Sequence, residues 1–174
     1  EILDLMQEEN QLASQYQRLY ASGMVEFRGE KLPLPKLGPY MESPDRATRR
    51  EAYAARASFF EANRAELDEL YGKLIRCRNE QGRRLGHKNY IQLGYDRLGR
   101  NCYTPEDVAA FREQIARDMV PIVAERKQAQ KERIGVDRIC LYDDKFLFPD
   151  GNAKPEGTAE EILAAVYHRQ EDQP

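Results

Sequence analysis

The chain has 174 residues, of which 41% are hydrophobic and 33% charged, and its formal net charge is −3. This length and composition predict one globular unit with a real hydrophobic core and argue against a disordered chain, while no apolar run approaches the roughly 20 residues of a membrane-spanning helix. The negative charge argues against a dedicated nucleic-acid-binding protein, because phosphate binding requires a basic surface.

The first part of the chain, residues 1–42, is expected to hold the end of a helix followed by a β-hairpin. Apolar residues give 1–12 a helical pattern, yet no capping residue or basic-then-apolar leader precedes it. Apolar and polar residues alternate over 25–34 around a Gly-containing turn, which is typical of a hairpin. A third strand is expected over 15–21.

Long helices are predicted over residues 43–135. Ser43-Pro44-Asp45 is a strong helix start, because it combines a capping hydroxyl, a proline in the first turn and an early acid. The helical pattern then continues to Gly86. An unbroken helix of that length would be about 60 Å long, whereas a compact domain of this size is roughly 40 Å across. The helix therefore bends, with Gly72 and Gly82 as candidates, or the chain is a piece of a larger protein. The absent first cap favours the second explanation.

The pattern predicts further helices up to residue 135. A short helix or turn-rich corner is expected over 87–99, and Thr104 with Asp107 resembles a capping box that opens the next helix. Pro121 is expected to kink that helix because it removes a backbone donor. Gly135 is expected to end it.

The last part, residues 136–174, is expected to contain a strand, a turn and a C-terminal helix. Alternating residues over 139–148 indicate the strand, Pro149-Asp150-Gly151 indicates the turn, and a second capping box at 158–161 opens a helix through Tyr167. The predicted fold class is mainly α, with long helices and a small antiparallel hairpin or sheet. The three parts are expected to form one structural unit of a larger protein.

Asp143, Asp144 and Asp150 lie close together in the sequence, and such a group of acids could hold a calcium ion. If Asp150 opened an EF-hand loop, position five would be Lys154 and position six Pro155, where an oxygen ligand and a glycine are needed. In a strand, Asp143 and Asp144 would point to opposite faces. We therefore expect no bound metal here.

The cysteines and histidines indicate the compartment and limit the chemistry. Cys77, Cys102 and Cys140 are widely spaced and odd in number, which favours free thiols in a reducing, cytoplasmic compartment. His87 and His168 belong to no His-Glu-x-x-His motif, so a complete catalytic zinc site is not expected within these residues.

Basic and aromatic residues on the predicted helices are interpreted as structural. The basic segments RATRR at 46–50 and GRR at 82–84 are predicted to be solvated helix faces, because acids lie beside both. The aromatic residues of the long helix are predicted to pack in the core: Tyr53, Phe59, Phe60 and Tyr71.

Several motifs follow one another in a fixed order. R-x-L-G-x-x-N-Y at 83–90 precedes Y-x-R-L-x-R-x-x-Y-T-x-x-D-V at 95–108, then V-P-I at 120–122, and a Tyr-Asp pair follows at 142–143. Together with the segment 25–53, this order resembles the thimet oligopeptidase and oligoendopeptidase F family of zinc metallopeptidases, especially the bacterial oligoendopeptidase F branch. The likeness spans nearly the whole chain.

The resemblance implies a mostly helical enzyme that encloses a deep channel and cuts short peptides. In that family, zinc is held by the two histidines of His-Glu-x-x-His and a later glutamate, and the Glu of the motif acts as general base. None of these elements occurs in this chain, and in the family they lie C-terminal to the corresponding segment. No catalytic, cofactor-binding or metal role is therefore transferred; zinc is expected only in the full-length enzyme.

Six residues are candidates for the substrate side of the channel: Tyr95, Arg97, Arg100, Tyr103, Tyr142 and Asp143. An arginine in the aromatic and basic corner at 95–103 would suit a peptide carboxylate as a two-pronged partner. The structural alternative, which is favoured, is that these residues pin the loop to helix carbonyls and acids.

Two functional hypotheses remain. The first is a non-catalytic portion of an oligoendopeptidase F-like zinc peptidase, forming part of the channel wall; its partners would be short peptides and the C-terminal catalytic portion, with no nucleic acid or membrane. The second is a free-standing helical scaffold or protein-interaction module. A segment of a larger enzyme is expected to expose an apolar face and to self-associate.

Overall fold

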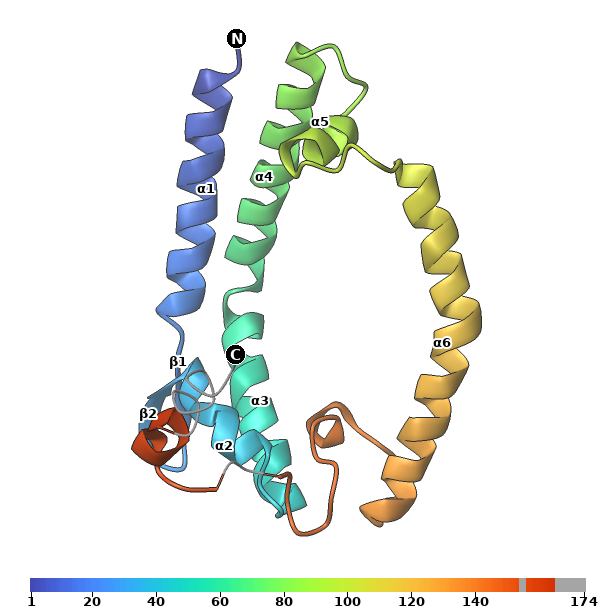
Figure 1. The fold of residues 1–174 in the computed structure, drawn as a ribbon. Coiled ribbons are helices and arrows are strands. Elements are labelled where there is room, and N and C mark those ends of the chain that lie inside the picture. Colours follow the sequence, from blue (N-terminus) through green and yellow to red (C-terminus); the bar gives the residue numbers. More distant parts are fainter. Residues whose placement is uncertain (154–155, 165–174) are drawn as a thin grey trace.

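The computed structural model describes residues 1–153 and 156–164 and confirms a mainly helical fold with a small antiparallel hairpin (Figure 1). The elements are, in chain order, α1 (Leu3–Ala21), β1 (Met24–Phe27), β2 (Glu30–Pro33), the 3₁₀ helix η1 (Leu34–Leu37), α2 (Gly38–Met41), α3 (Arg46–Ala62), α4 (Arg64–Arg84), α5 (Tyr90–Arg97), α6 (Pro105–Arg133) and the 3₁₀ helix η2 (Leu141–Asp143).

The arrangement places α1 alongside α4, with α3 continuing the line of α4 and the hairpin packed beside α3 (Figure 1). Helix α5 crosses the far end of α4. Helix α6 stands apart from this body in the figure, and the segment after it returns to the start of α3. None of the described helices has the length and apolar character that a membrane crossing requires.

The predicted hairpin is confirmed. Val25 pairs with Leu32 and Phe27 with Glu30, and the two turn residues Arg28 and Gly29 have φ of 54° and 82°, as a two-residue type I′ turn requires. The third strand predicted over 15–21 is wrong, because these residues complete α1.

The helical spacing of α1 explains that correction. Leu5 and Leu12 are buried against α4, and Leu19, seven residues further on, packs at the same cluster. A helix that buries one face keeps this period, whereas a strand would turn every second residue away. Packing against α4 therefore outweighs the local strand preference.

Two clusters of buried side chains form the core. One joins the hairpin to α3 and consists of Val25, Phe27, Leu34, Leu37, Ala52 and Phe59. The other joins α1 to α4 and consists of Leu5, Leu12, Leu70, Leu74 and Cys77. Of the aromatic residues predicted to pack, Phe59 and Phe60 do so, with ring centroids 5.3 Å apart, but Tyr71 is 60% exposed.

The overlong helix predicted from residue 44 to 86 is interrupted at Asn63, and not at the glycines. The Asn63 side-chain amide donates to the Phe59 carbonyl at 2.7 Å, which takes over one of the last acceptors of α3. Gly82 lies within α4 for a different reason: a side chain there would collide with the backbone carbonyl of Asn89. This close approach lets the chain return against α4 and start α5.

The helix ends follow the predicted capping chemistry with one shift. The cap of α3 is Asp45, whose carboxylate accepts from the amides of Ala47 and Thr48, and not Ser43. The capping box of Thr104 and Asp107 at the start of α6 is confirmed. Helix α6 continues through its internal proline.

Gly135 ends α6, as predicted. Its φ is 67°, and its amide donates to the Glu132 carbonyl while the Val136 amide donates to that of Lys131. These two bonds form the Schellman arrangement of a helix terminus, which favours glycine at this position.

The strand predicted over 139–148 is wrong; the segment holds η2 and irregular turns. The reason is that Asp143 accepts from the Cys140 amide at 3.0 Å and caps a tight turn in place of a strand. The capping box at Thr158 and Glu161 is present and residues 159–164 are helical. The rest of the helix predicted through Tyr167 lies outside the described residues.

A buried carboxylate, Glu9, ties α1 to α4 and α5. It is 6% exposed and accepts from Arg78 (2.8 Å), the Gln81 amide (2.9 Å) and Arg97 (3.0 Å), a group that we call the Glu9 cluster. Burial raises the pKa of Glu9, but the hydrogen bonds from these three side chains outweigh it and lower the pKa to about 2. Nearby, Arg84 of the GRR segment donates to Asp4 at 2.8 Å, and both arginines of this segment are exposed, as predicted for a solvated helix face.

We expect the Glu9 cluster to make stability depend on pH at the acid end. Since the pKa of Glu9 is about 2 in the folded chain against an ordinary 4.5, its contribution is complete above about pH 4.5 and is lost as the pH falls toward 2. The free-energy gap between wild type and Glu9→Gln, measured by urea unfolding, should therefore shrink by about 3 kcal/mol from pH 6 to pH 2.

The matched control is Glu8→Gln, because Glu8 is the exposed neighbour of Glu9. This variant should stay within about 0.5 kcal/mol of wild type at pH 6. A gap between wild type and Glu9→Gln that does not change with pH would contradict the role given to the cluster.

Candidate functional site

The junction between α5 and α6 brings three of the predicted site residues together. The rings of Tyr95 and Tyr103 meet edge to face with centroids 6.1 Å apart, and the Arg100 guanidinium lies 5.4 Å from the Tyr95 ring centroid. Gly99, with φ of 66°, allows the turn, and the Arg100 amide donates back to the Tyr95 carbonyl at 2.9 Å. We call Tyr95, Arg100 and Tyr103 the tyrosine–arginine corner.

Two cavities open beside this corner. One, of about 390 Å³, has a polar wall that includes Gln92 and Asp96; the other, of about 470 Å³, is walled by Val108 and Phe111. Arg100 and Tyr103 line both cavities. A guanidinium between a polar and an apolar hollow suits a ligand that carries a carboxylate next to an apolar group.

The acid shared by both cavities is already engaged. Asp107 accepts from the Thr104 amide at 2.8 Å and from its hydroxyl at 2.9 Å, and these bonds lower the pKa of Asp107. Among the residues that the structure describes, Arg100 forms no ion pair, so its two-pronged donor is not used within this part of the chain.

Arg97 lies close in sequence but does not join the corner. One of its terminal nitrogens donates to Glu9 (3.0 Å), to the side-chain carbonyl of Gln81 (3.2 Å) and to the Tyr90 hydroxyl (3.0 Å). Arg97 therefore follows the structural alternative, in which it pins the loop to an acid of α1.

Tyr142 and Asp143, the other predicted pair, lie at the opposite end of the molecule, beside the start of α3. Asp143 is fully buried. Its carboxylate accepts from Arg49 (2.9 Å), from two nitrogens of Arg46 (3.1 and 2.8 Å) and from the Cys140 amide. We call Asp143, Arg46 and Arg49 the Asp143 cluster.

The four bonds fill the acceptor positions of the Asp143 carboxylate, so it has none left for a substrate. Burial raises the pKa of Asp143, but the bonds from Arg46 and Arg49 outweigh it and keep the pKa below its ordinary value. The Arg46 guanidinium also lies 5.3 Å from the ring centroid of Tyr142. Asp143 and the Tyr142 ring are therefore already in contact with arginines of this chain.

The RATRR segment is consequently a solvated face only in part, because Arg46 and Arg50 are exposed whereas Thr48 and Arg49 are buried. Arg49 is 2% exposed and its guanidinium lies 3.9 Å from the centroid of the Phe146 ring. Sequence reasoning missed this role, although Arg46 and Arg49 stand three residues apart and so share one face of α3. That spacing was the only sign of the role in the sequence. The partner, Asp143, lies 94 residues beyond Arg49 and could not be identified from it.

The Asp143 cluster also fixes the end of α6. The Gln130 side-chain amide donates to the carbonyls of Asp143 (3.0 Å) and Phe146 (2.7 Å), and Lys127 pairs with Asp144 at 2.6 Å. The start of α3 and the C-terminal end of α6 are thus held by the same short segment.

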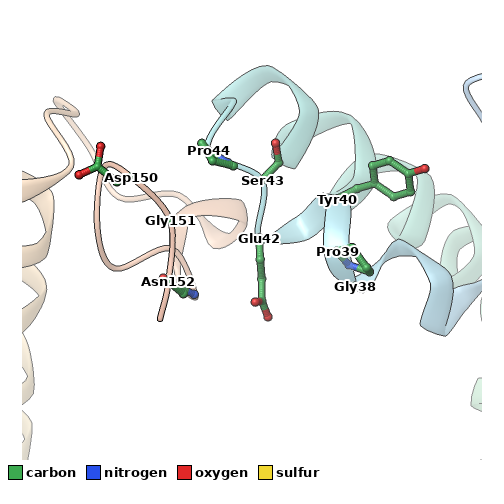
Figure 2. Close-up of a pocket in the computed structure, with 9 residues that line it drawn as sticks. All are labelled: Gly38, Pro39, Tyr40, Glu42, Ser43, Pro44, Asp150, Gly151 and Asn152. Carbon is green, nitrogen blue, oxygen red and sulfur yellow. The ribbon is translucent and has the colours of Figure 1, made fainter. Parts of the chain in front are cut away.

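A third cavity, of about 780 Å³, lies between the α2–α3 connection and the loop at 150–152 (Figure 2). Figure 2 shows the carboxylates of Glu42 and Asp150 pointing in different directions. Asn152 is used by its own loop, since it accepts from the Leu147 amide and donates to the Lys145 carbonyl. Among the described residues that line the cavity, no set of side chains converges on one point as the ligands of a metal ion would.

The residues do not fit the zinc that the family resemblance implies. Within residues 1–153 and 156–164 no three His, Cys, Asp or Glu side chains are placed to hold a metal ion. The acids at 143, 144 and 150 do not meet, because Asp143 is buried in its cluster and Asp144 pairs with Lys127. No chemical step is therefore derived through a metal in this chain.

Comparison with known proteins was made at the level of families, curated proteins and solved structures. The model of peptidase family M3 matches residues 39–164. A search of curated proteins gave no match. PZ peptidase A, solved with an inhibitor, is 43% identical with a TM-score of 0.91, covering 94% of this chain and 29% of that one.

Two further structures, both assigned as oligoendopeptidase F, are similar. One is 43% identical with a TM-score of 0.94, covering 98% of this chain and 30% of the other. The second, from Bacillus anthracis str. Ames, is 38% identical with a TM-score of 0.88, covering 95% and 30%. The fold is thus shared with much larger helical peptidases. The chain belongs to peptidase family M3, and it spans about 30% of the length of the structures it matches.

We expect Asp143→Asn to be strongly destabilising. The substitution leaves Arg49 buried without its charged partner, which costs about 3–5 kcal/mol, measured by chemical unfolding at pH 7. The matched control is Asp144→Asn, whose carboxylate is 57% exposed in its pair with Lys127 and which should cost at most about 1 kcal/mol. Equal effects of the two substitutions would contradict a structural role for the buried charge.

Proposed function

We propose that this chain is the non-catalytic portion of an oligoendopeptidase F-like zinc metallopeptidase that hydrolyses short peptides. The observation that carries the proposal is the match of nearly the whole chain, 94–98%, to only 29–30% of larger peptidase structures at 38–43% identity. The three cysteines are free, which supports a reducing, cytoplasmic location. In the proposed enzyme, zinc and its ligands belong to the remaining part of the polypeptide.

Within that enzyme, we place the tyrosine–arginine corner on the substrate side of the channel. The support is chemical: Arg100 offers a planar donor pair beside the Tyr95 ring, Arg100 and Tyr103 line both cavities, and Val108 and Phe111 supply an apolar wall. The corner would bind the carboxylate of a short peptide and position its chain. Residues 1–42, 43–135 and 136–174 act in this proposal as one unit of the channel wall.

The first test is the activity of the 174-residue chain itself. With added zinc and a fluorogenic short peptide, we expect no turnover that a chelator abolishes, because no set of zinc ligands is present in the described residues. The protein encoded by the complete gene should cleave the same peptide and lose this activity with chelator. Chelator-sensitive turnover by the 174-residue chain would contradict the proposal, as would a complete gene without a His-Glu-x-x-His motif.

The second test concerns Arg100 in the complete protein. Arg100→Ala should lower kcat/KM about 10- to 100-fold for peptides with a free C-terminal carboxylate, because it removes a charge-assisted bond, and should change it little for the same peptides as C-terminal amides. Arg50→Ala, at an exposed position of α3, is the control and should leave both values unchanged. A loss that is equal for acids and amides would show that Arg100 does not read the carboxylate.

A further inference from the structure

The middle of α6 carries six large, exposed apolar side chains. At about 100° of rotation per residue, they fall within an arc of about 180° that also includes Arg112, while Glu113, Arg117 and Asp118 lie in the other half. We call the following six residues the α6 face: Phe111, Ile115, Met119, Val120, Ile122 and Val123. Each of them exposes between 38% and 60% of its surface.

Within the described residues, α6 is anchored mainly near its ends. At the C-terminal end Lys127, Gln130 and Arg133 donate to the segment 144–147, and at the N-terminal end the helix follows directly from the tyrosine–arginine corner. Along its middle, α6 stands away from α1 and α4 (Figure 1). A patch of six large apolar side chains in contact with water marks an interaction surface.

The larger M3 structures share this placement. The superpositions cover 94–98% of the chain with TM-scores of 0.88–0.94, so they include α6 together with the α1–α4 body. In each of those structures, the part that this chain does not cover is more than twice as long as the part that it covers. A helix that is fastened near its ends keeps a fixed position when another body packs along its middle.

We propose that the α6 face is the docking surface for the remainder of a longer M3 peptidase polypeptide. This inference rests on the proposed function and adds the surface through which this part is joined to the rest. A helix that pairs with one neighbour needs an apolar stripe of about 100°. The arc of about 180° on α6 is wide enough for an enclosing body and wider than a second copy of α6 would cover.

The test compares two substitutions in the protein encoded by the complete gene. Met119→Asp places a charge near the centre of the α6 face, and Gln114→Asp places the same charge on the polar half of the same helix. Met and Gln have similar helix propensities, so the intrinsic cost of the two changes is matched. We expect Met119→Asp to lower the unfolding midpoint by at least about 5 °C relative to Gln114→Asp.

The same two substitutions in the 174-residue chain give the second measurement. There the midpoints should agree, because nothing in the described residues covers Met119, which is 50% exposed. Equal midpoints in the complete protein would overturn the proposal, and so would a Met119→Asp midpoint that is lowered as much in the short chain. A dimer of the short chain that Met119→Asp dissociates, found together with equal midpoints in the complete protein, would assign the face to a second copy and overturn it too.

The outcome is separable from that of the proposed function. A lowered midpoint in a complete protein without chelator-sensitive peptide cleavage supports the docking surface and contradicts the zinc peptidase. Cleavage with equal midpoints supports the peptidase and contradicts the docking surface.

Discussion

The buried carboxylate of Asp143 joins parts of the chain that lie 94 and 97 residues apart, at Arg49 and Arg46. Removing a carboxylate and a guanidinium from water costs several kcal/mol per ion, and only a complete set of hydrogen bonds offsets that cost. The Asp143 carboxylate has such a set, and Gln130 adds bonds from α6 to the same turn. The start of α3 and the end of α6 are therefore both bound to the turn that carries the Asp143 carboxylate, and other arrangements would leave this buried charge without its partners.

At the other end of the molecule, the Glu9 cluster likewise joins separate elements, since its hydrogen bonds connect α1 to α4 and α5. The two clusters hold opposite ends of the α3–α4 line (Figure 1). This separation explains why the candidate site residues fall into two groups. Arg97 and Asp143 form their hydrogen bonds within the two clusters. Tyr95, Arg100 and Tyr103 lie together beside two cavities. It also leaves the middle of α6 without support from the described part of the chain.

Family membership and function rest on different observations here. The match of the M3 family model to residues 39–164 of the chain, together with superpositions on larger peptidases, establishes the family. The zinc chemistry that the family resemblance implies requires a set of metal ligands that residues 1–153 and 156–164 do not bring together, and a fold does not by itself define an activity. What the described residues offer is a helical body, an arginine beside the Tyr95 ring, and a helix with six exposed apolar side chains.

The amino-acid sequence alone determined the features that depend on neighbouring residues. The hairpin turn at Arg28-Gly29, the capping box of Thr104 and Asp107, the end of α6 at Gly135 and the order of family motifs all follow from local stereochemistry and spacing. Only the tertiary structure decided that residues 15–21 remain helical, that 139–148 form no strand, and that Arg46 and Arg49 bind the buried carboxylate of Asp143. A partner far away in the chain takes part each time: α4 packs against α1, and Arg46 and Arg49 bind the Asp143 carboxylate that also caps the turn at 140–143. Such a partner competes with local preference through packing and charge, and no local pattern records it.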